Sequence, residues 1–324
     1  MRAAAAAGIL ASVLLVGARA GAVPPYALNN GPGDGTVDLG VNGYGQLGFD
    51  FGYRDYYDPV GLYVPAQTDT ISQSWLLIRT GAGAFTPLYD TAGAPTVAGT
   101  ATSASSSFID ASSSLAFHLA QVLTPVWNGT SRIGTLLTQT YAIENPTASE
   151  ISFDLARFVD ADVNNPTDGG GRLFVNALEL LFETDTATGT ASAPVVVAIT
   201  GEGGTIPATG RYELARYPDL GNSLYTTGAI HDTVYHDGAD ADQILDAGMA
   251  DDVEIALRNQ FVVGPGQSDT YVTRTYWVSG DLPEPGSLAA LGSGTAWLVV
   301  LRALRDRRAS SRCGRASHSG GSGV

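Results

Sequence analysis

The stretch Ile151-Ser152-Phe153-Asp154-Leu155-Ala156 alternates large apolar residues with small or polar ones. A period of two puts the apolar side chains on one face of an extended chain, which is typical of a β-strand with one buried face. The same alternation recurs at Leu115–Ala120 and Val253–Leu257, and Tyr271–Val278 is rich in β-branched and aromatic residues. These segments predict an all-β fold.

Turn signals separate these segments. They include Gly31-Pro32-Gly33, Asn145-Pro146 and Gly264-Pro265-Gly266. Short alternating strands joined by such turns are typical of antiparallel sandwiches. We therefore expect one antiparallel β-sandwich domain, jelly-roll-like, over residues 23–281.

Three segments give finer expectations. Phe49, Phe51 and Tyr53 alternate with a polar residue and a glycine, which favours a strand. The segment from Thr91 to Ser114 is rich in Ala, Ser, Thr and Gly, which favours a long flexible loop. The segment from Asp242 to Met249 is the best candidate for a helical turn.

Both ends of the chain resemble targeting segments. Arg2, an apolar run from Ala3 to Val16 and Ala-x-Ala exits at Ala20 or Ala22 predict a secretory signal peptide over residues 1–22. Near the other end, an apolar stretch at about 287–304 is followed by a basic cluster, which predicts a single transmembrane helix. By the positive-inside rule the body lies outside and the disordered basic tail, 309–324, lies in the cytoplasm. The residues that stop transfer are Arg302, Arg305, Arg307 and Arg308.

The segment 282–308 resembles a PEP-CTERM protein-sorting domain. The resemblance rests on Pro283, Glu284 and Pro285, on the apolar stretch and on the arginine cluster. It implies a Gram-negative bacterium, export by Sec-type machinery and anchoring in the inner membrane. It also implies processing by an exosortase, a membrane-embedded enzyme whose genes are often tied to exopolysaccharide production. The processed protein would then reach the cell surface or the extracellular matrix.

The composition excludes several functions. The chain has no lysine, so no Schiff-base or Walker-type lysine is present, and its one cysteine, Cys313, lies in the basic tail. Residues 23–281 carry 9 arginines against 30 acidic residues, a net charge of −21. Nucleic acid is therefore an unfavourable partner, because its phosphates need cationic neutralisation.

One acidic segment has the spacing of a calcium-binding loop. Asp160, Asp162, Asn164 and Asp168 occupy the first, third, fifth and ninth places of that spacing. Hard oxygen ligands on one short segment suit Ca²⁺, which takes six to eight of them. The sixth and twelfth places lack the glycine and the glutamate of an EF-hand, so the segment is no EF-hand. An Asx-rich turn joining two strands is the favoured interpretation, and a calcium site is the alternative.

The function we infer from the sequence is that of an exported surface or extracellular-matrix protein, associated with exopolysaccharide and without enzymatic activity. No catalytic motif is evident. The alternative is a secreted carbohydrate-binding module or glycan-active enzyme anchored by the same tail. In that case an aromatic-rich segment that includes Tyr44, Tyr53 and Tyr57 could stack on sugars, although core packing explains these residues equally well.

Overall fold

The computed structural model describes residues 26–59, 70–163, 168–175, 178–185, 195–207, 211–238, 241, 243–245, 249 and 251–279. The expected signal peptide (1–22), sorting segment (282–308) and basic tail (309–324) lie outside these residues. Within the described ranges, no helix is long and apolar enough to cross a membrane.

The described part of the chain is all-β, as the alternating segments predict. Its strands form three sheets, whose neighbours are antiparallel except for the pair β14 and β15. The smallest sheet has the order β1 (Tyr26–Asn29), β2 (Thr36–Val41), β3 (Asp55–Asp58). The six-stranded sheet has the order β15 (Thr233–Val234), β14 (Tyr212–Arg216), β16 (Val253–Val263), β10 (Ile151–Asp160), β4 (Gln73–Arg79), β5 (Thr86–Pro87). The eight-stranded sheet has the order β11 (Asp168–Val175), β12 (Leu178–Asp185), β13 (Val195–Gly203), β17 (Ser268–Ser279), β9 (Ser131–Glu144), β8 (Ala116–Asn128), β7 (Ser103–Ile109), β6 (Ala98–Thr100).

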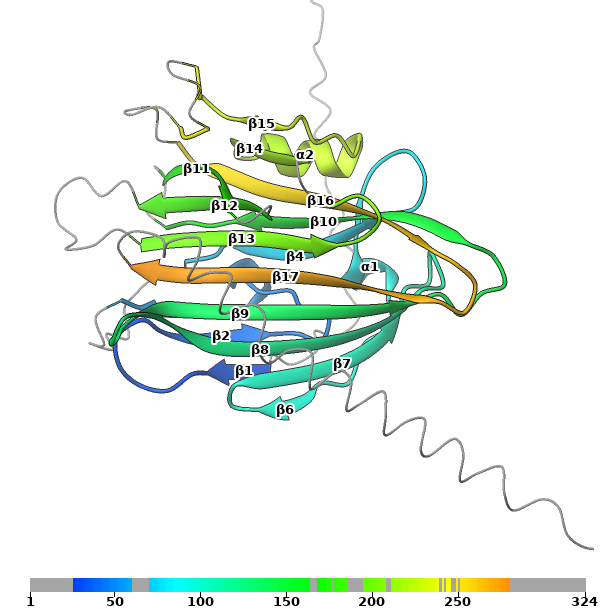
Figure 1. The fold of residues 1–324 in the computed structure, drawn as a ribbon, viewed down its shortest axis with the longest axis horizontal. Helices are drawn as coiled ribbons and strands as arrows, with labels where there is room; N and C mark the ends of the chain where they lie inside the picture. Colours follow the sequence, from blue (N-terminus) through cyan, green and yellow to red (C-terminus); the bar gives the residue numbers. More distant parts are fainter. Residues whose placement is uncertain are drawn as a thin grey trace, which may run out of the picture.

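The two larger sheets pack face to face. Phe153 and Leu155 of β10 share a buried apolar cluster with Phe117 of β8 and Tyr271 of β17. The ring of Tyr271 also meets that of Phe261 of β16 edge-on, with centroids 5.9 Å apart. This two-layered arrangement of antiparallel sheets fits the expected β-sandwich. The long strands of the larger sheet run side by side in Figure 1.

The outer face of the six-stranded sheet is also partly covered. The helix α2 (Asp219–Thr226) places Leu220 and Leu224 in a buried cluster with Ala156 and Phe158 of β10. In Figure 1, α2 lies with β14 and β15 at one edge of the molecule. Two shorter elements, η1 (Phe49–Phe51) and α1 (Leu88–Thr91), complete the described helices. Strand β10 is therefore buried on both faces.

The expected strand through Phe49 and Phe51 is wrong, because these residues form the 3₁₀ turn η1. Gly48 and Gly52 flank the turn with φ of 117° and 75°, in the region that glycine adopts without steric cost. A side chain at Gly48 would also collide with the carbonyl oxygen of Ser72, 2.4 Å from an ideal Cβ. The two glycines thus break the alternation.

The expected loop from Thr91 to Ser114 is also wrong. Strand β7 pairs with β8 through this segment, and its residues alternate between buried and exposed. Ala104 and Phe108 are buried, and the ring of Phe108 stacks on that of Phe117 with centroids 5.2 Å apart. Small serine and alanine side chains hide this alternation in the sequence.

The helical turn expected from Asp242 to Met249 is wrong for the residues of that segment that the structure describes. Gln243 has a φ of 70°, and Ile244 forms an antiparallel bridge with Gly171. The amide of Leu245 donates to the carbonyl oxygen of Gly170 at 2.9 Å. Residues 243–245 therefore pair alongside β11 and do not form a helix.

Candidate metal centre

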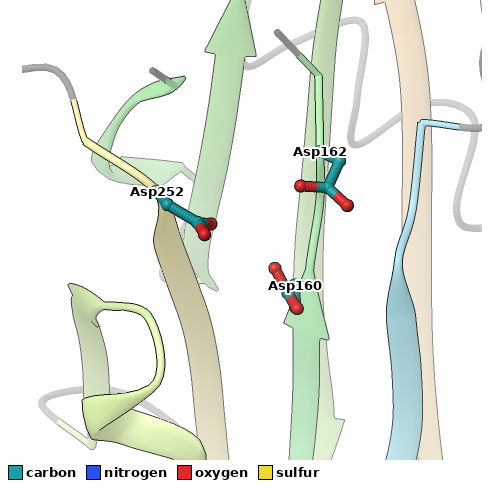
Figure 2. Close-up of side chains that lie close together, drawn as sticks. All are labelled: Asp160, Asp162 and Asp252. Carbon is teal, nitrogen blue, oxygen red and sulfur yellow. The ribbon is translucent and has the colours of Figure 1, made fainter. Parts of the chain in front are cut away.

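The described residues among those predicted to bind calcium lie at and just beyond the end of strand β10 and at the start of β11. Asp160 is the last residue of β10, Asp162 follows it by two, and Asp168 begins β11. Asn164 lies outside the described residues. One carboxylate oxygen from each of Asp160, Asp162 and Asp252 lies within 4.8 Å of the other two. Figure 2 shows the three side chains close together. We call these three residues the carboxylate cluster.

The register of the sheet explains the cluster. Strands β10 and β16 are antiparallel, with Asp160 opposite Glu254. Continuing that register by two residues puts Asp162 opposite Asp252. Because side chains two apart along an extended chain share a face, all four carboxyl groups project from the outer face of the sheet. The sequence signal that could have revealed Asp252 is the acidic run Asp251-Asp252-Val253-Glu254 at the start of a strand.

Asp168 lies beside the cluster rather than in it. Its amide donates to the carbonyl oxygen of Asp251 at 2.9 Å, and the reverse bond is 3.2 Å long. The pairing fixes the chain immediately before Asp252. The predicted loop thus contributes two carboxylates directly, and Asp168 acts through the backbone.

Asp160 is the most deeply placed member of the cluster. Its side chain points toward Asp162 and Asp252 in Figure 2, and the residue is only 3% exposed. Its Oδ1 atom accepts no hydrogen bond from any residue in the described part of the chain. Burial, and after it the nearby carboxyl groups of Glu254, Asp162, Asp252 and Asp50, together raise the pKa of Asp160 to about 9. The environment therefore opposes a bare negative charge.

Two further carboxyl groups border the cluster. Glu183 of β12 is fully buried, its Oε2 accepts the amide of Ala161 at 3.1 Å, and its Oε1 accepts no bond from the described residues. Burial, then Asp168 and Asp160, raise its pKa well above the usual value. Burial also raises the pKa of Glu254 to about 7, although the amides of Gly221 and Leu220 lower it. Carboxyl groups from both large sheets therefore lie next to the carboxylate cluster, Glu183 from the eight-stranded sheet and Glu254 from the six-stranded sheet.

A bound cation would neutralise the repulsion between these carboxylates and stabilise their ionised forms. The basic group that affects the cluster is Arg216, which lowers the pKa of Asp252 and forms an ion pair with Asp251 at 2.9 Å. Two oxygens bound to one Ca²⁺ at 2.3–2.6 Å lie at most about 5 Å apart, so the 4.8 Å limit permits three ligands from the cluster. An all-carboxylate set suits a hard ion such as Ca²⁺ rather than a softer metal.

The other predicted site residues divide into two groups. The sorting motif and the arginine stop lie outside the described residues. The aromatic residues proposed for sugar stacking are largely buried: Tyr44 is 8% exposed, Tyr53 is 6% and Tyr57 is 3%. Core packing is therefore the correct interpretation for these three tyrosines.

Comparison with known proteins gives limited information. No family model and no curated protein matches the chain. Among solved structures, a bacterial glucoamylase complexed with acarbose aligns with a TM-score of 0.48 and 12% identity, covering 84% of this chain and 36% of that one. A polysaccharide lyase aligns with a TM-score of 0.35 and 12% identity, covering 81% of this chain and 33% of that one. The chain thus spans about a third of each structure's length, and likeness of this degree assigns no activity.

Proposed function

We propose that the chain is an exported protein of the cell surface or extracellular matrix whose β-sandwich is stabilised by Ca²⁺ and which performs no chemistry. The observation that carries the calcium role is the convergence of Asp160, Asp162 and Asp252, with an unpartnered buried oxygen on Asp160 among the described residues. The sorting role rests on the sequence, through the signal peptide and the tail that resembles PEP-CTERM domains.

A cation at the carboxylate cluster would act as a cross-link. It would join the end of β10 to the residue preceding β16, and Glu183 would connect it to β12 of the other sheet. Extracellular modules commonly bind Ca²⁺ with dissociation constants of about 10⁻⁴–10⁻³ M. Binding of this strength would fill the site outside the cell and leave it empty in the cytoplasm, so the full stability of the fold would develop after export.

The sorting part of the proposal assigns the remaining partners. A Sec-type pathway would carry the body across the inner membrane, and an exosortase would recognise Pro283, Glu284 and Pro285. Mass spectrometry of the mature protein from cell envelope and medium tests this part. We expect an amino terminus after Ala20 or Ala22 and a carboxyl terminus near the Pro-Glu-Pro motif. An intact chain from Met1 to Val324 in the cytosol would refute it.

The calcium part has its own test. Thermal unfolding of the full-length protein with EDTA and with Ca²⁺ should give a higher melting temperature with Ca²⁺, and Mg²⁺ should give a smaller shift because it prefers fewer protein ligands. Equal melting temperatures in EDTA and Ca²⁺ would remove the calcium role and leave the sorting proposal standing.

A second candidate function is glycan binding beside the same cluster. Tyr217 is 43% exposed and lies close enough to Asp160 and Asp252 for their charges to raise its pKa, after the effect of burial. Nearby, the Trp75 ring lies 4.9 Å from Phe51 and 5.8 Å from Tyr225 between centroids, and Tyr225 is 37% exposed. Exposed rings beside a cation site suit a polysaccharide.

A glycan-binding screen of the full-length protein, with and without Ca²⁺, tests this candidate. Retention by one polysaccharide should be lost in Tyr217→Ala and Tyr225→Ala. It should persist in Tyr56→Ala, a half-buried tyrosine of the three-stranded sheet. Failure of every glycan to bind would rule this candidate out.

A further inference from the structure

A second charged site lies at the other end of the six-stranded sheet. Arg79 ends β4, Arg258 lies in β16 and Arg211 immediately precedes β14. In the strand order β14-β16-β10-β4 these arginines surround Asp154 of β10. Asp154 is opposite Arg79, and the amide of Arg258 donates to the carbonyl oxygen of Arg211 at 2.9 Å. We call Arg79, Arg211 and Arg258 the arginine cluster.

The arginine cluster carries more positive charge than its surroundings neutralise. Asp154 forms a close ion pair with Arg79, and its Oδ1 lies 3.5 Å from Nη2 of Arg211. Arg258 has no ion pair among the described residues. Burial and then the charge of Arg211 lower its pKa, and Arg79 lowers it too, while Asp154 and Asp232 oppose this effect. Three of the nine arginines in residues 23–281 thus lie around Asp154, which contacts two of them.

Each member of the cluster has a spare donor. Nε of Arg79, Nη1 of Arg211 and Nε of Arg258 are buried and donate to nothing in the ranges that the structure describes. A buried donor without an acceptor destabilises the fold, and more so when it is charged. The three open donors therefore identify a place where an acceptor is missing from the protein itself.

The geometry of Arg79 is fixed without any ligand. Its Nη1 donates to the carbonyl oxygens of Gly228 at 2.9 Å and Gly83 at 3.2 Å. Its guanidinium also lies over the ring of Phe85, 4.4 Å from the centroid. The Arg79 and Arg211 side chains are 13% and 15% exposed, so a small solute can approach their edges from solvent. The site is thus held in position. Its three open donors are themselves buried, so an anion would approach them through the exposed edges of Arg79 and Arg211.

We propose that the arginine cluster binds a small oxyanion, a carboxylate or sulfate group, on the outer face of the six-stranded sheet. The planar guanidinium fork matches the paired oxygens of these groups better than it matches a spherical ion. The Asp154 carboxylate already forms ion pairs with Arg79 and Arg211, so these two arginines bind a carboxylate within the protein itself. Six residues of β10 separate Asp154 from Asp160, or about 20 Å. The oxyanion site and the carboxylate cluster are therefore separate, and each can fail without the other.

Isothermal titration calorimetry of the full-length protein tests the proposal with sodium glucuronate, sodium sulfate and neutral glucose. We expect saturable binding of glucuronate and sulfate and none of glucose. A preference for glucuronate would assign an acidic sugar as the natural source of the group, and equal affinities would assign a free oxyanion. The absence of saturable binding by both anions would overturn the proposal.

Two substitutions with opposite expected effects separate binding from folding. Arg211→Gln removes a charged donor and should weaken glucuronate binding at least about tenfold. Asp154→Asn removes the competing carboxylate and should tighten binding, whatever it does to stability. Arg54→Gln, at an exposed position beside the three-stranded sheet, is the matched control and should bind as the natural protein does. Binding that is unchanged in both Arg211→Gln and Asp154→Asn would place the anion elsewhere and refute the site.

Discussion

Asp160→Asn should stabilise the protein in EDTA and remove the stabilisation that Ca²⁺ gives. In EDTA, the pKa of about 9 in the folded state, against an ordinary 3.8, means that the folded protein holds the Asp160 proton at neutral pH. The unfolded chain releases it, so the carboxyl destabilises the fold increasingly as pH rises from 3.8 toward 9. At pH 7 this penalty reaches up to about 4 kcal/mol. Asparagine has no such penalty and nearly the same shape, so the variant should be more stable than the natural protein in EDTA.

With Ca²⁺ the difference in stability between Asp160→Asn and the natural protein should narrow. A concentration of 100 times the dissociation constant stabilises the natural protein by about 2.7 kcal/mol. For a domain of this size that is roughly 5–10 °C in melting temperature. Asp160→Asn removes a buried ligand and should show almost no shift with Ca²⁺.

Differential scanning calorimetry in EDTA and in Ca²⁺ measures both effects. Asp34→Asn, an exposed aspartate between β1 and β2, is the control and should keep the full calcium shift. Asp252→Asn should lose it, because Asp252 belongs to the carboxylate cluster although it lies outside the predicted loop. A full calcium shift in Asp160→Asn would refute the assignment of the ligands.

Two further predictions test the fold. Phe108→Ala should destabilise the protein by about 3–5 kcal/mol in urea unfolding, because Phe108 is 6% exposed and stacks on Phe117. Ile109→Ala, at a neighbouring residue that is 59% exposed, should change stability by less than about 0.5 kcal/mol, and equal losses would contradict strand β7. Burial would raise the pKa of Asp110, but hydrogen bonds from Ser113, Thr91 and Ser112 outweigh burial and hold it below 3.8. The ionised form therefore stabilises the fold above that pH, so Asp110→Asn should cost roughly 1–3 kcal/mol at pH 7, and the difference should shrink as pH falls below 3.8. A difference that stays constant from pH 7 to pH 3 would show that the ionised carboxylate contributes nothing.

The sequence predicted the β-class because the long central strands alternate cleanly. Strand β16 and the first half of β10, up to Leu155, carry their largest apolar residues at alternate positions, and a period of two is a direct consequence of extended geometry. Strand β7, which lies beside the edge strand β6, was not predicted because its inward side chains are mostly small, so the sequence contrast between its two faces is weak. The structure of β7 is determined by its pairing with β8, and the composition of β7 alone does not reveal that pairing.

The helix α2 was not predicted from the sequence, for a related reason. Leu220 and Leu224 have the four-residue spacing of a helical face, but Gly221, Asn222 and Thr226 are weak helix formers. Its stability comes from packing on Phe158 of β10 and from Glu254, whose Oε2 accepts the Gly221 amide at 3.0 Å. Both contacts depend on tertiary structure.

The candidate site was predictable in part. The spacing of Asp160 and Asp162 followed from residues close in the sequence, whereas Asp252 joins them only through the antiparallel register of β10 and β16. The arginine cluster was not predictable for the same reason: its three members lie far apart along the chain, and the overall acidity of the body conceals them. Sites assembled from neighbouring strands require knowledge of the register.

A crystal structure determined in saturating Ca²⁺ tests the central claim most directly. We expect one ion with oxygens of Asp160, Asp162 and Asp252 at about 2.3–2.6 Å. If crystals grown in saturating Ca²⁺ showed no ion between Asp160, Asp162 and Asp252, the calcium assignment would be wrong.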